Sequence, residues 1–459
     1  MINKLFVTLI LLLFSFSCKE TPPEPGNGGG RDNGMLTVED VGVTDAVLRL
    51  RVPGGFKSRC ITLKRLPAEQ AGDTTTILSR QITSLDTIII DENLLPKHSY
   101  RYVLTVNNFF NTQERYYAGI TTMDTTSHNF TWQIDTLGDG NSSILRDVAM
   151  INDTLAYAVG EIYHSDSLNS QSPFGLAIWN GKKWTLKRLY FNCRLFWPDC
   201  VPAGDWLTTG KSVFSTGQDN IWIAASSVKH FDGKQWYEYA GNGAGSANKI
   251  WGSSPTNMYF VGSSGLIVHY DGSRWERIES GTDVNFTDVW GSPDGKVVWA
   301  CGYFNNKRGT CLLRCMDNTW EVAYDGTPTE FSLLHDTLSG ALTSVYTPSS
   351  RYIYVCSHFG LYRASANTRG EAKRYSFTSS GFPGFPRGMR GSGINDITIA
   401  GDYTMIARWN GITWRYYEEL RNSKIHFNAV AQKRNLVVAV GVLTDPIHGK
   451  GVACIGKRK

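Results

Sequence analysis

Residues 250–275 of this 459-residue chain read Ile250-Trp-Gly-Ser-Ser-Pro-Thr-Asn-Met-Tyr-Phe-Val-Gly-Ser-Ser-Gly-Leu-Ile-Val-His-Tyr-Asp-Gly-Ser-Arg-Trp275. Short apolar segments alternate with turn-forming residues, and an Asp-Gly pair precedes the final tryptophan. Asp-Gly is a strong hairpin signal, because both central positions of the tight turn it favours need positive φ. The segment therefore predicts consecutive antiparallel strands joined by tight turns.

The same pattern recurs along most of the chain. Copies of Asp/Asn-Gly-x-x-Trp end at Trp184, Trp236, Trp275 and Trp414, and a divergent copy ends at Trp320. The apolar segment that precedes this element has seven copies, starting at Asp147, Ser212, Lys249, Asp288, Ser344, Gly388 and Asn428. The long gap after Trp320 contains a copy whose turn has diverged, near Arg374 and Tyr375. A period near 45 residues with four short strands per copy predicts a β-propeller.

The seventh copy ends without its own tryptophan strand. The segment Phe130-Thr-Trp132-Gln-Ile134 lies in phase with the repeat at the other end of this region. We therefore expect residues 129–137 to supply the outer strand of the last blade and to close the ring, which removes an exposed sheet edge. The sequence thus predicts a seven-bladed propeller over residues 129–459, and six or eight blades fit less well.

The repeat resembles bacterial propellers of the photosystem-assembly-factor and neuraminidase-repeat type. The region from Asn129 to Lys459 resembles a family of Bacteroidota lipoproteins, some of which carry a glucosyltransferase label. That resemblance transfers no catalytic residues to this chain. A glucosyltransferase that uses a sugar nucleotide usually needs a Rossmann-like domain and often an Asp-x-Asp metal clamp. The sequence contains no Asp-x-Asp and no alternating strand–helix pattern, so we do not expect this activity.

The N-terminus has the pattern of an export signal. Residues 1–17 combine a short basic start with an apolar run from Leu5 to Phe14, which is too short to span a bilayer. Ser15-Phe-Ser-Cys18 resembles a bacterial lipobox, which implies acylation of Cys18; the alternative is a cleaved signal with an incidental cysteine. Residues 18–34 are polar and rich in Pro and Gly, which predicts a flexible tether. The Lys19-Glu20 pair resembles export signals of surface-exposed Bacteroidota lipoproteins, so we expect a lipid-anchored protein on the outer membrane.

Residues 35–124 predict a second, smaller all-β domain. Several segments alternate apolar and polar residues with period two, among them Ala46 to Val52. The pattern Leu94-x-Pro96-x-x-x-Tyr100 resembles the fibronectin type III family, in which the tyrosine hydroxyl hydrogen-bonds to the backbone and fixes a corner between two sheets. The resemblance implies a β-sandwich that serves either as a binding module or as a spacer, and we favour the spacer.

Charge and residue spacing argue against several classes of partner. The 46 Lys and Arg residues exceed the 41 Asp and Glu residues by only five, and they form no dense basic stripe, so we expect no nucleic-acid partner. The nine histidines are scattered, and no His-x-x-x-His or Cys-x-x-Cys spacing occurs, so we expect no metal and no cofactor. His230 and His269 occupy the repeat position at which Arg408 also occurs, which indicates a strand position.

The remaining cysteines allow two pairings. Cys193 and Cys200 lie in one inserted loop and can form a disulfide in an oxidising compartment. Cys301 and Cys311 lie on neighbouring predicted strands and can pair if the register allows it. Three cysteines lie in apolar strand contexts and are expected to be buried thiols: Cys60, Cys356 and Cys454.

The best candidate binding surface is the insertion between the first two blades. Aromatic rings crowd this segment, and sugar-binding surfaces use exposed rings with polar neighbours. The candidate ligand-binding residues are Tyr190, Phe196, Trp197 and Trp206, with Arg194 and Asp199 beside them. The alternative is a hydrophobic plug over the ring. The loop from Phe382 to Arg387 has a similar composition, whereas Trp251 and Trp290 are expected to pack between blades.

These observations favour a binding or scaffold protein that recognises a glycan or an envelope protein, with no assigned catalytic residue. The alternative is a carbohydrate-active enzyme, sialidase-like or lyase-like. Ser292-Pro-Asp-Gly-Lys-Val-Val-Trp299 resembles the sialidase Asp-box, but that element is a turn rather than a catalytic motif. An enzyme should gather ionisable residues with perturbed pKa values in one deep pocket, whereas a binding protein should not.

We expect alanine at both Trp197 and Trp206 to weaken glycan binding without unfolding the propeller, because exposed rings supply stacking surface rather than core packing. The measurement is a glycan array with the soluble chain from Asp32, with hydrolysis products monitored. Full retention of binding would exclude the inserted loop.

Overall fold

The structure is a computed structural model. It describes residues 35–51, 59–67, 74–82, 86–107, 113–139, 142–165, 172–192, 205–241, 243–304, 309–326, 338, 340–349, 352–365, 373–375, 384–444 and 449–459. Apart from two 3-10 helices, Ala244–Ser246 (η2) and Glu418–Leu420 (η3), every regular element described is a β-strand. The chain divides into two compact units, Met1–Thr125 and Thr126–Lys459.

The first unit consists of two antiparallel sheets. One has the order β1-β2-β5, and the other has the order β4-β3-β6-β7. The strands are β1 (Leu36–Val41), β2 (Asp45–Arg51), β3 (Arg59–Pro67), β4 (Thr75–Ile82), β5 (Asp86–Glu92), β6 (Ser99–Asn107) and β7 (Gln113–Thr121). Alternate residues of β2, β3 and β6 form a shared apolar core, because successive side chains of a strand point to opposite faces.

Two hydrogen bonds to one carboxylate tie these sheets together. Asp91 on β5 accepts hydrogen bonds from Tyr102 Oη (2.8 Å) and Arg65 Nη1 (2.8 Å), which belong to the other sheet. The hydroxyl of Tyr100 accepts a hydrogen bond from the Leu95 N–H at 2.9 Å. The tyrosine therefore bonds to the backbone of the segment that precedes it, as the Leu-x-Pro-x-x-x-Tyr pattern predicts.

The second unit contains seven four-stranded antiparallel sheets among its described residues. In six of them the four strands are consecutive in the chain. The sheets are β9–β12 (Ile144–Asn152, Leu155–Ile162, Phe174–Trp179, Trp184–Lys187); β15–β18 (Ser212–Gly217, Asn220–Ala225, Ser227–Phe231, Trp236–Tyr239); β19–β22 (Lys249–Ser254, Asn257–Val261, Ile267–Tyr270, Trp275–Ile278); β23–β26 (Asn285–Gly291, Val297–Tyr303, Thr310–Met316, Thr319–Asp325); β27–β30 (Leu342–Tyr346, Tyr352–Ser357, Gly360–Ser365, Lys373–Tyr375); β31–β34 (Pro386–Gly393, Asp396–Gly401, Ile406–Trp409, Trp414–Tyr416); and β35 (Ile425–Lys433), β36 (Leu436–Leu443), β37 (Lys450–Arg458) with β8 (Phe130–Leu137).

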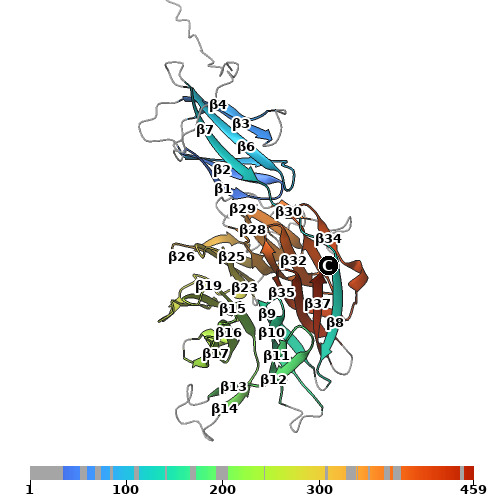
Figure 1. The fold of residues 1–459 in the computed structure, drawn as a ribbon. Coiled ribbons are helices and arrows are strands. Elements are labelled where there is room, and N and C mark those ends of the chain that lie inside the picture. The colour runs from blue at the N-terminus through green and yellow to red at the C-terminus, as the bar shows by residue number, and fades with distance from the viewer. Residues whose placement is uncertain are drawn as a thin grey trace, which may run out of the picture. The chain divides into compact units, whose positions relative to one another are not determined.

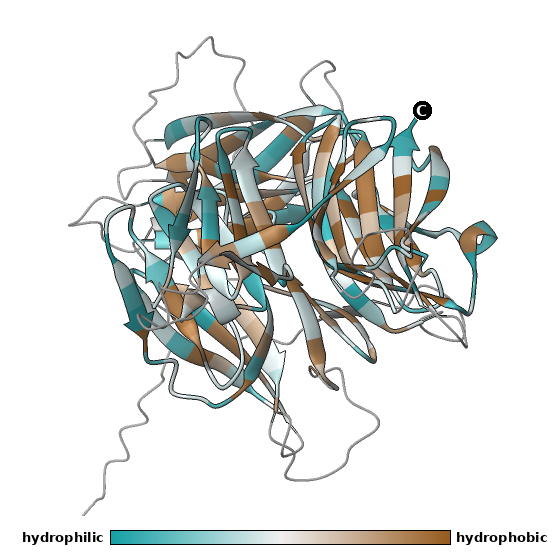
Figure 2. Cartoon of the chain, turned by 90° about the horizontal axis from the view of Figure 1, so that it is seen from below, coloured by the Kyte–Doolittle hydropathy of each residue, from teal (hydrophilic) through white to brown (hydrophobic). Residues whose placement is uncertain are grey.

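The first strand of each sheet contacts the first strands of its two neighbours. The contacts run from β9 to β15, β19, β23, β27, β31 and β35, and β35 returns to β9. Figure 1 shows the sheets set around a common centre. Figure 2 shows strands of the second unit that are apolar over much of their length. β16 and β32 are buried at every position, as expected for strands of sheets that pack against neighbours on both faces. This cyclic packing is the arrangement of a β-propeller.

The last sheet joins the two ends of the unit. Strand β8 pairs antiparallel with β37, from Leu137 opposite Gly451 to Phe130 opposite Arg458. The Phe130 ring lies under two guanidinium groups, with Arg408 Cζ at 4.0 Å and Arg458 Cζ at 5.4 Å from its centroid. Both arginines also pair with the buried carboxylate of Asp396. Charge and ring packing therefore anchor the start of β8.

The repeated Asp/Asn-Gly element is a four-residue loop. Phe231 pairs with Trp236, and the backbone N–H groups of Lys234 and Gln235 both donate to Asp232 Oδ1 at 2.9 Å. Only the glycine has positive φ (91° at Gly233), so the expectation of two positive-φ residues is wrong for this loop. The expectation of two positive-φ residues holds in the divergent copy. There Asp317 (φ 48°) and Asn318 (φ 60°) form a two-residue turn between Met316 and Thr319.

A β-bulge recurs near the start of the innermost strands. In five of them the pairing with the second strand skips one residue, namely Arg146, Thr287, Thr343, Arg387 or Asn428. The bulge brings a carbonyl oxygen close to the end of the second strand. A Cβ on Gly160 would lie 2.1 Å from Ile144 O, and one on Gly441 would lie 1.9 Å from His426 O. A small residue is therefore required near the end of these second strands, because a larger side chain would overlap the carbonyl oxygen of the bulge.

The cysteines differ partly from expectation. Cys60 is disulfide-bonded, so the prediction of a buried thiol there is wrong. Cys301 and Cys311 are both free, because Cys301 pairs with Leu312 and Cys311 with Gly302 in the ladder. Cys356 and Cys454 are free and buried, and burial raises the pKa of each thiol. Cys193 and Cys200 lie outside the described residues, as does Cys18.

We expect Gly441→Ala to destabilise the second unit by roughly 1–3 kcal/mol, because its methyl group would overlap the His426 carbonyl. Gly217→Ala is the matched control, since no atom lies within 4 Å of its Cβ position. Thermal denaturation of the two variants measures the difference. Equal stability of both would show that the bulge does not restrict the second strand.

Candidate functional site

The innermost strands surround two cavities. The start-side cavity, near the beginning of these strands, has a volume of about 590 Å³ and is lined by residues such as Arg146, Asn285 and Thr343. The end-side cavity, near their other end, has a volume of about 360 Å³ and is lined by residues such as Met150, Phe214 and Lys433. Lys249 and Arg390 line both. The two cavities therefore lie on opposite sides of a shared layer of charged side chains.

Asp147 on β9 is the first member of this charged layer. Its carboxylate accepts hydrogen bonds from Val148 N (2.9 Å), Ser212 Oγ (2.7 Å), Val213 N (3.1 Å) and Lys249 Nζ (2.5 Å). These donors come from three different sheets. The carboxylate is 5% exposed, and its acceptor positions are occupied.

Asp288 on β23 repeats the arrangement three sheets further on. It accepts hydrogen bonds from Val289 N (3.0 Å), Ser344 Oγ (2.5 Å) and Val345 N (3.0 Å), and a bidentate pair from Arg390 (2.6 and 2.8 Å). Burial alone would raise the pKa of Asp288, but the positive charge of Arg390 and its hydrogen bonds hold that pKa below the ordinary value. The same pairing raises the pKa of Arg390 despite its burial.

This geometry limits the chemistry of the cavities. Among the described residues that line them, the carboxylates are Asp147, Asp288 and Glu161, and each is paired with a cation; Glu161 accepts from Arg146 at 2.6 Å. A general acid needs a raised pKa and a proton to give. The Asp288 carboxylate is instead held ionised, and the network joins neighbouring sheets. Lys249 and Arg390, the two cations of the charged layer, therefore line both cavities.

The five bulged positions, together with Lys211 and Asn248, which directly precede β15 and β19, form a polar ring around the start-side cavity. The ring contains Arg146, Lys211, Asn248, Thr287, Thr343, Arg387 and Asn428. Four of these side chains donate to a carbonyl of the next sheet, as Thr287 Oγ1 does to Leu342 O at 2.9 Å and Asn428 Nδ2 to Leu145 O at 2.8 Å. Asn428 therefore occupies, in its own sheet, the bulged position that Arg146 occupies in the first sheet. The alignment of the repeats from the sequence placed Asn428 at the position of Asp147, which is one residue too far along the strand.

The three cations of this ring differ in their partners. Arg146 pairs with Glu161, and Arg387 pairs with Asp402 at 2.6 Å. Each of these two acids directly follows the small residue near the end of the second strand of its sheet. In the sheet of Lys211, the corresponding residue is Ser226. Lys211 is exposed, and no carboxylate among the described residues pairs with it. The start-side cavity therefore has one uncompensated positive charge at its edge.

The predicted binding residues are only partly described. Tyr190 and Trp206 lie on a two-stranded ribbon, β13 (Leu189–Asn192) and β14 (Asp205–Thr208), labelled in the lower part of Figure 1. Tyr190 is opposite Leu207, and Trp206 is opposite Phe191, so the two predicted rings project from opposite faces of the ribbon. Tyr190 and Trp206 are 44% and 42% exposed. Arg194, Phe196, Trp197 and Asp199 lie outside the described residues.

Other exposed rings lie near the start-side cavity. Phe385 is 45% exposed and packs against His358, which lines the cavity, at 5.6 Å between ring centroids. Tyr403 packs edge-on against His426 at 5.3 Å, and His426 Nδ1 lies 3.1 Å from Asp402 Oδ1. Arg387 contacts the same Asp402 carboxylate. The loop around Phe385, which the sequence singled out second, thus lies in a cluster of aromatic and ionisable groups.

The remaining candidates have structural roles. His230 and His269 each bond to an asparagine on the neighbouring strand, Asn220 or Asn257, at 2.9 Å, and burial lowers their pKa values. In the segment that resembles an Asp-box, Ser292 Oγ donates to Asp294 Oδ1 and accepts from Val297 N, which closes the turn between β23 and β24.

Trp290 lies farther inside than expected. Its ring contacts Phe214, Trp251 and Tyr346 from three other sheets, and Arg390 Cζ lies 4.2 Å from its centroid. It therefore forms one wall of the end-side cavity.

The described residues offer neither a metal-binding cluster nor a membrane-spanning helix. No cluster of three or more His, Cys, Asp or Glu side chains there has an arrangement that could hold a metal ion. No helix in that part of the chain has the length and apolar character needed to cross a membrane.

No protein-family model and no curated protein matches the sequence. Similar solved structures include YCF48 bound to a D1 peptide, with 14% identity and a TM-score of 0.49, covering 73% of this chain and 99% of that chain. The WD40 β-propeller domain of Doa1 has 13% identity and a TM-score of 0.47, covering 72% and 97%. YCF48 from Cyanidioschyzon merolae has 12% identity and a TM-score of 0.44, covering 71% and 98%. At these values the similarities carry no conclusion about function.

We expect the buried charge pair to make stability depend on pH. Because the folded-state pKa of Asp288 lies below its ordinary value of 3.8, its contribution is complete above that value and is lost as the pH falls through the folded-state pKa. The free energy of unfolding should therefore fall less steeply in acid for Asp288→Asn than for the unchanged protein. Glu419→Gln, which removes a 56% exposed carboxylate, is the control and should keep the original slope. Equal slopes for all three proteins would contradict the assignment.

Proposed function

We propose that this protein is a binding or scaffold protein whose second unit is a seven-bladed β-propeller, and that a partner protein docks on the face around the start-side cavity. The observation that carries the proposal is the grouping of exposed apolar side chains with cations on that face. The charged layer beneath it supports recognition rather than catalysis, because its carboxylates are committed to ion pairs and to bonds between sheets.

The strand directions place several exposed rings on one face. Connections that enter the first strands, and turns between second and third strands, lie on the side where the first strands begin. Exposed large apolar residues in those connections are Tyr190, Trp206, Leu207, Phe359, Phe385 and Tyr403. Interface cores are enriched in aromatic residues, and exposed apolar groups of this kind indicate a docking surface.

The charges on this face favour an acidic partner. Lys211 has no carboxylate partner among the described residues, and Arg146 and Arg387 stand on the same ring. Complementary charge at the edge of an interface speeds association and orients the partner. We therefore propose a partner protein with an acidic, partly apolar surface. A glycan that stacks on Tyr190 or Phe385 is the other outcome that the experiment distinguishes.

The cellular context of this proposal rests on sequence signals. We propose that Cys18 is lipidated, that the protein lies on the outer surface of a bacterial outer membrane, and that the partner is an envelope protein. We also propose that the first unit is a fibronectin type III-like spacer. Its sheet orders, β1-β2-β5 and β4-β3-β6-β7, and the Tyr100 hydrogen bond support that assignment.

The carbohydrate-active alternative is less well supported. A glycosidase needs a carboxylic acid with a raised pKa beside a second carboxylate. The carboxylates that line the described cavities are instead paired with Arg146, Lys249 and Arg390. A sialidase-like or lyase-like activity would have to use groups other than these.

We expect a photo-crosslinking residue at Phe385 or Tyr190 to capture the same protein in cells, whereas the same residue at Ile412 should not. Ile412 is the matched control because it is 43% exposed in a turn on the opposite face. Lys211→Glu should reduce the crosslink at both positions, because it would repel an acidic partner.

Purified partner and protein then allow a binding measurement. Phe385→Ala should weaken binding at least roughly tenfold, the usual effect of truncating a central aromatic contact, and Ile412→Ala should not change it. Equal crosslinking from both faces, or binding that is insensitive to Lys211→Glu and Phe385→Ala, would overturn the proposal. Glycan-array binding that depends on the same residues would replace the protein partner with a glycan.

A further inference from the structure

The start of β8 lies against a charge cluster in which, among the described residues, the cations outnumber the carboxylates. The guanidinium groups of Arg408 and Arg458 both pair with the carboxylate of Asp396, and the Arg408 side chain is fully buried. Burial and the charge of Arg458 lower the pKa of Arg408, but only to about 10. Arg408 therefore stays charged at neutral pH, and the cluster carries an excess of positive charge.

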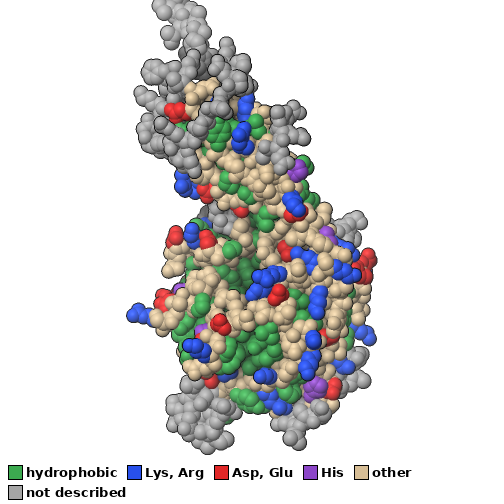
Figure 3. All heavy atoms as spheres, in the orientation of Figure 1, with side chains coloured by type: hydrophobic (Ala, Val, Ile, Leu, Met, Phe, Trp, Pro, Cys, Tyr) green, Lys and Arg blue, Asp and Glu red, His purple; other side chains and the backbone are tan. Residues whose placement is uncertain are grey.

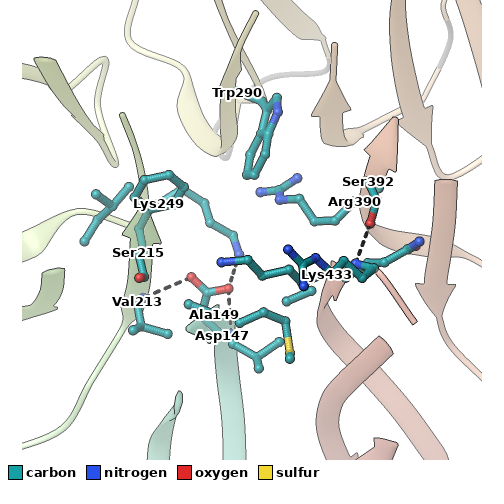
Figure 4. Close-up of a pocket in the computed structure, with 17 residues that line it drawn as sticks. Asp147, Ala149, Val213, Ser215, Lys249, Trp290, Arg390, Ser392 and Lys433 are labelled. Atoms are coloured by element: carbon teal, nitrogen blue, oxygen red, sulfur yellow. Dashed lines mark hydrogen bonds and ion pairs between the residues drawn. The ribbon is translucent and has the colours of Figure 1, made fainter. Parts of the chain in front are cut away.

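The charged layer inside the ring has no such excess. Each of its two cations has its own carboxylate, because Lys249 pairs with Asp147 (Figure 4) and Arg390 pairs with Asp288. Figure 3 shows basic side chains gathered over the part of the second unit in which Figure 1 labels β34, β37 and β8. Because like charges repel, one more positive charge at the start of β8 would weaken the contacts there.

His128 lies beside this cluster, two residues before the start of β8. The hydroxyl of Tyr417 donates to the carbonyl oxygen of His128 at 2.7 Å, and Arg408 Nη1 donates to Ser127 O at 3.2 Å. Arg408 belongs to β33, and Tyr417 directly follows β34. The segment that leads into β8 is therefore fixed to the sheet of β31–β34.

Hydrogen bonds determine which nitrogen of the His128 ring carries the proton. The Thr413 hydroxyl donates to Asn410 Oδ1 at 3.3 Å, so it accepts a hydrogen bond from His128 Nε2 at 3.3 Å. The other ring nitrogen, Nδ1, is then unprotonated. It is buried and has no hydrogen-bond partner among the described residues. A proton added to Nδ1 would therefore enter a buried position without an acceptor.

The charges that act on the His128 ring oppose such a proton. Burial lowers the pKa of His128 below its ordinary value of 6.5, and three guanidinium groups lower it further. These groups are Arg408 of β33, Arg415 of β34 and Arg458 of β37. The backbone of Thr413 acts in the opposite direction, but less than the first two arginines do. The carboxylates of Asp396 and Glu419 are already paired with these arginines, and burial raises the pKa of Tyr417, which stays neutral.

A buried histidine in another sheet has different surroundings. Burial also lowers the pKa of His269 on β21, but the carboxylates of Asp271 and Glu276 act against that shift. Its Nε2 lies 2.9 Å from Asn257 Oδ1. His269 therefore provides a matched control, because its ring is similarly buried but is faced by carboxylates instead of guanidinium groups.

We propose that His128 makes the attachment of β8 sensitive to acid. Neutral His128 packs beside Arg408 and Arg458, whereas protonated His128 adds a positive charge to a cluster whose one carboxylate is already shared. Protonation therefore favours release of the segment before β8 and of β8 itself. The strand can detach alone, because it is the outermost strand of its sheet and pairs only with β37. This inference does not depend on the proposed function, since it uses none of the residues of the docking face.

Linkage between protonation and opening gives the direction and size of the effect. Released His128 titrates near its ordinary pKa of 6.5, and attached His128 titrates below it. The attached state is therefore most stable above pH 6.5 and loses stability as the pH falls towards the lower pKa. Within this range the equilibrium constant for opening of β8 should rise by up to about tenfold per pH unit, because opening takes up one proton.

Hydrogen exchange of the full-length protein between about pH 7.5 and about pH 5 measures this constant, after correction for the intrinsic effect of pH on exchange. Protection of residues 130–137 should fall with pH more steeply than protection of β20. In His128→Gln it should stay nearly constant, because glutamine keeps an N–H group for Thr413 and takes up no proton. His269→Gln should show the same loss at β8 as the unchanged protein.

A second measurement needs no substitution. The ring C–H signals of His128, followed by NMR against pH, should give a pKa below 6.5 in the unchanged protein. A pKa at or above 6.5 overturns the proposal. The same conclusion follows if protection of β8 does not depend on pH, if it falls equally in His128→Gln, or if all seven sheets lose protection together.

Discussion

The second unit depends on the hydrogen-bonded pairing of β8 with β37. This pairing completes the sheet of β35, β36 and β37, which lies between β31 and β9 in the ring. Both cavities exist because the innermost strands form a closed cycle, so their shape follows from that one contact between the two ends of the unit. Asp396, Arg408 and Arg458 reinforce it around Phe130, where the paired charges are shielded from water.

Inside the ring, two aspartates repeat the same structural solution. Asp147 and Asp288 each accept the N–H of the following residue, and then a serine hydroxyl and an N–H from the next sheet. Each also binds a cation from farther round the ring, which is Lys249 or Arg390. Buried charges are tolerated when they are paired and fully hydrogen-bonded. The layer thus separates the two cavities, with Lys211 in the lining of one and Lys433 in the lining of the other.

The repeat predicted much of this architecture because it is a local pattern. The alternation of short apolar segments and turns located the strands, and the phase of Trp132 indicated the pairing that β8 makes with β37. Near Arg374, where the sequence predicts a diverged turn, the structure instead has a strand, β30. The turn geometry was wrong for Asp232 because its side chain, rather than a second positive-φ residue, closes the loop.

The candidate site was harder to predict because its contacts join distant residues. Asp147 and Asp288 were visible as starts of the repeat, but their bonds to Ser212 and Ser344 depend on how neighbouring sheets pack. The one-residue shift at Asn428 follows from a bulge, which no propensity signals. The faces of Tyr190 and Trp206 follow from the strand register, which the aromatic composition of the loop did not contain.

The use of β8 in the last sheet has a consequence for how the chain folds. Six sheets pair strands that follow one another, so their contacts are local and can form early. β8 must wait for a partner that lies at the far end of the unit, and the entropy of closing that long loop is offset only when the ring is complete. If the chain emerges from its N-terminus during synthesis or export, β8 is the first strand of the unit to appear and the last to pair. Until then its backbone N–H and C=O groups have no partner strand, which makes β8 a point of contact for a folding helper or for misassembly.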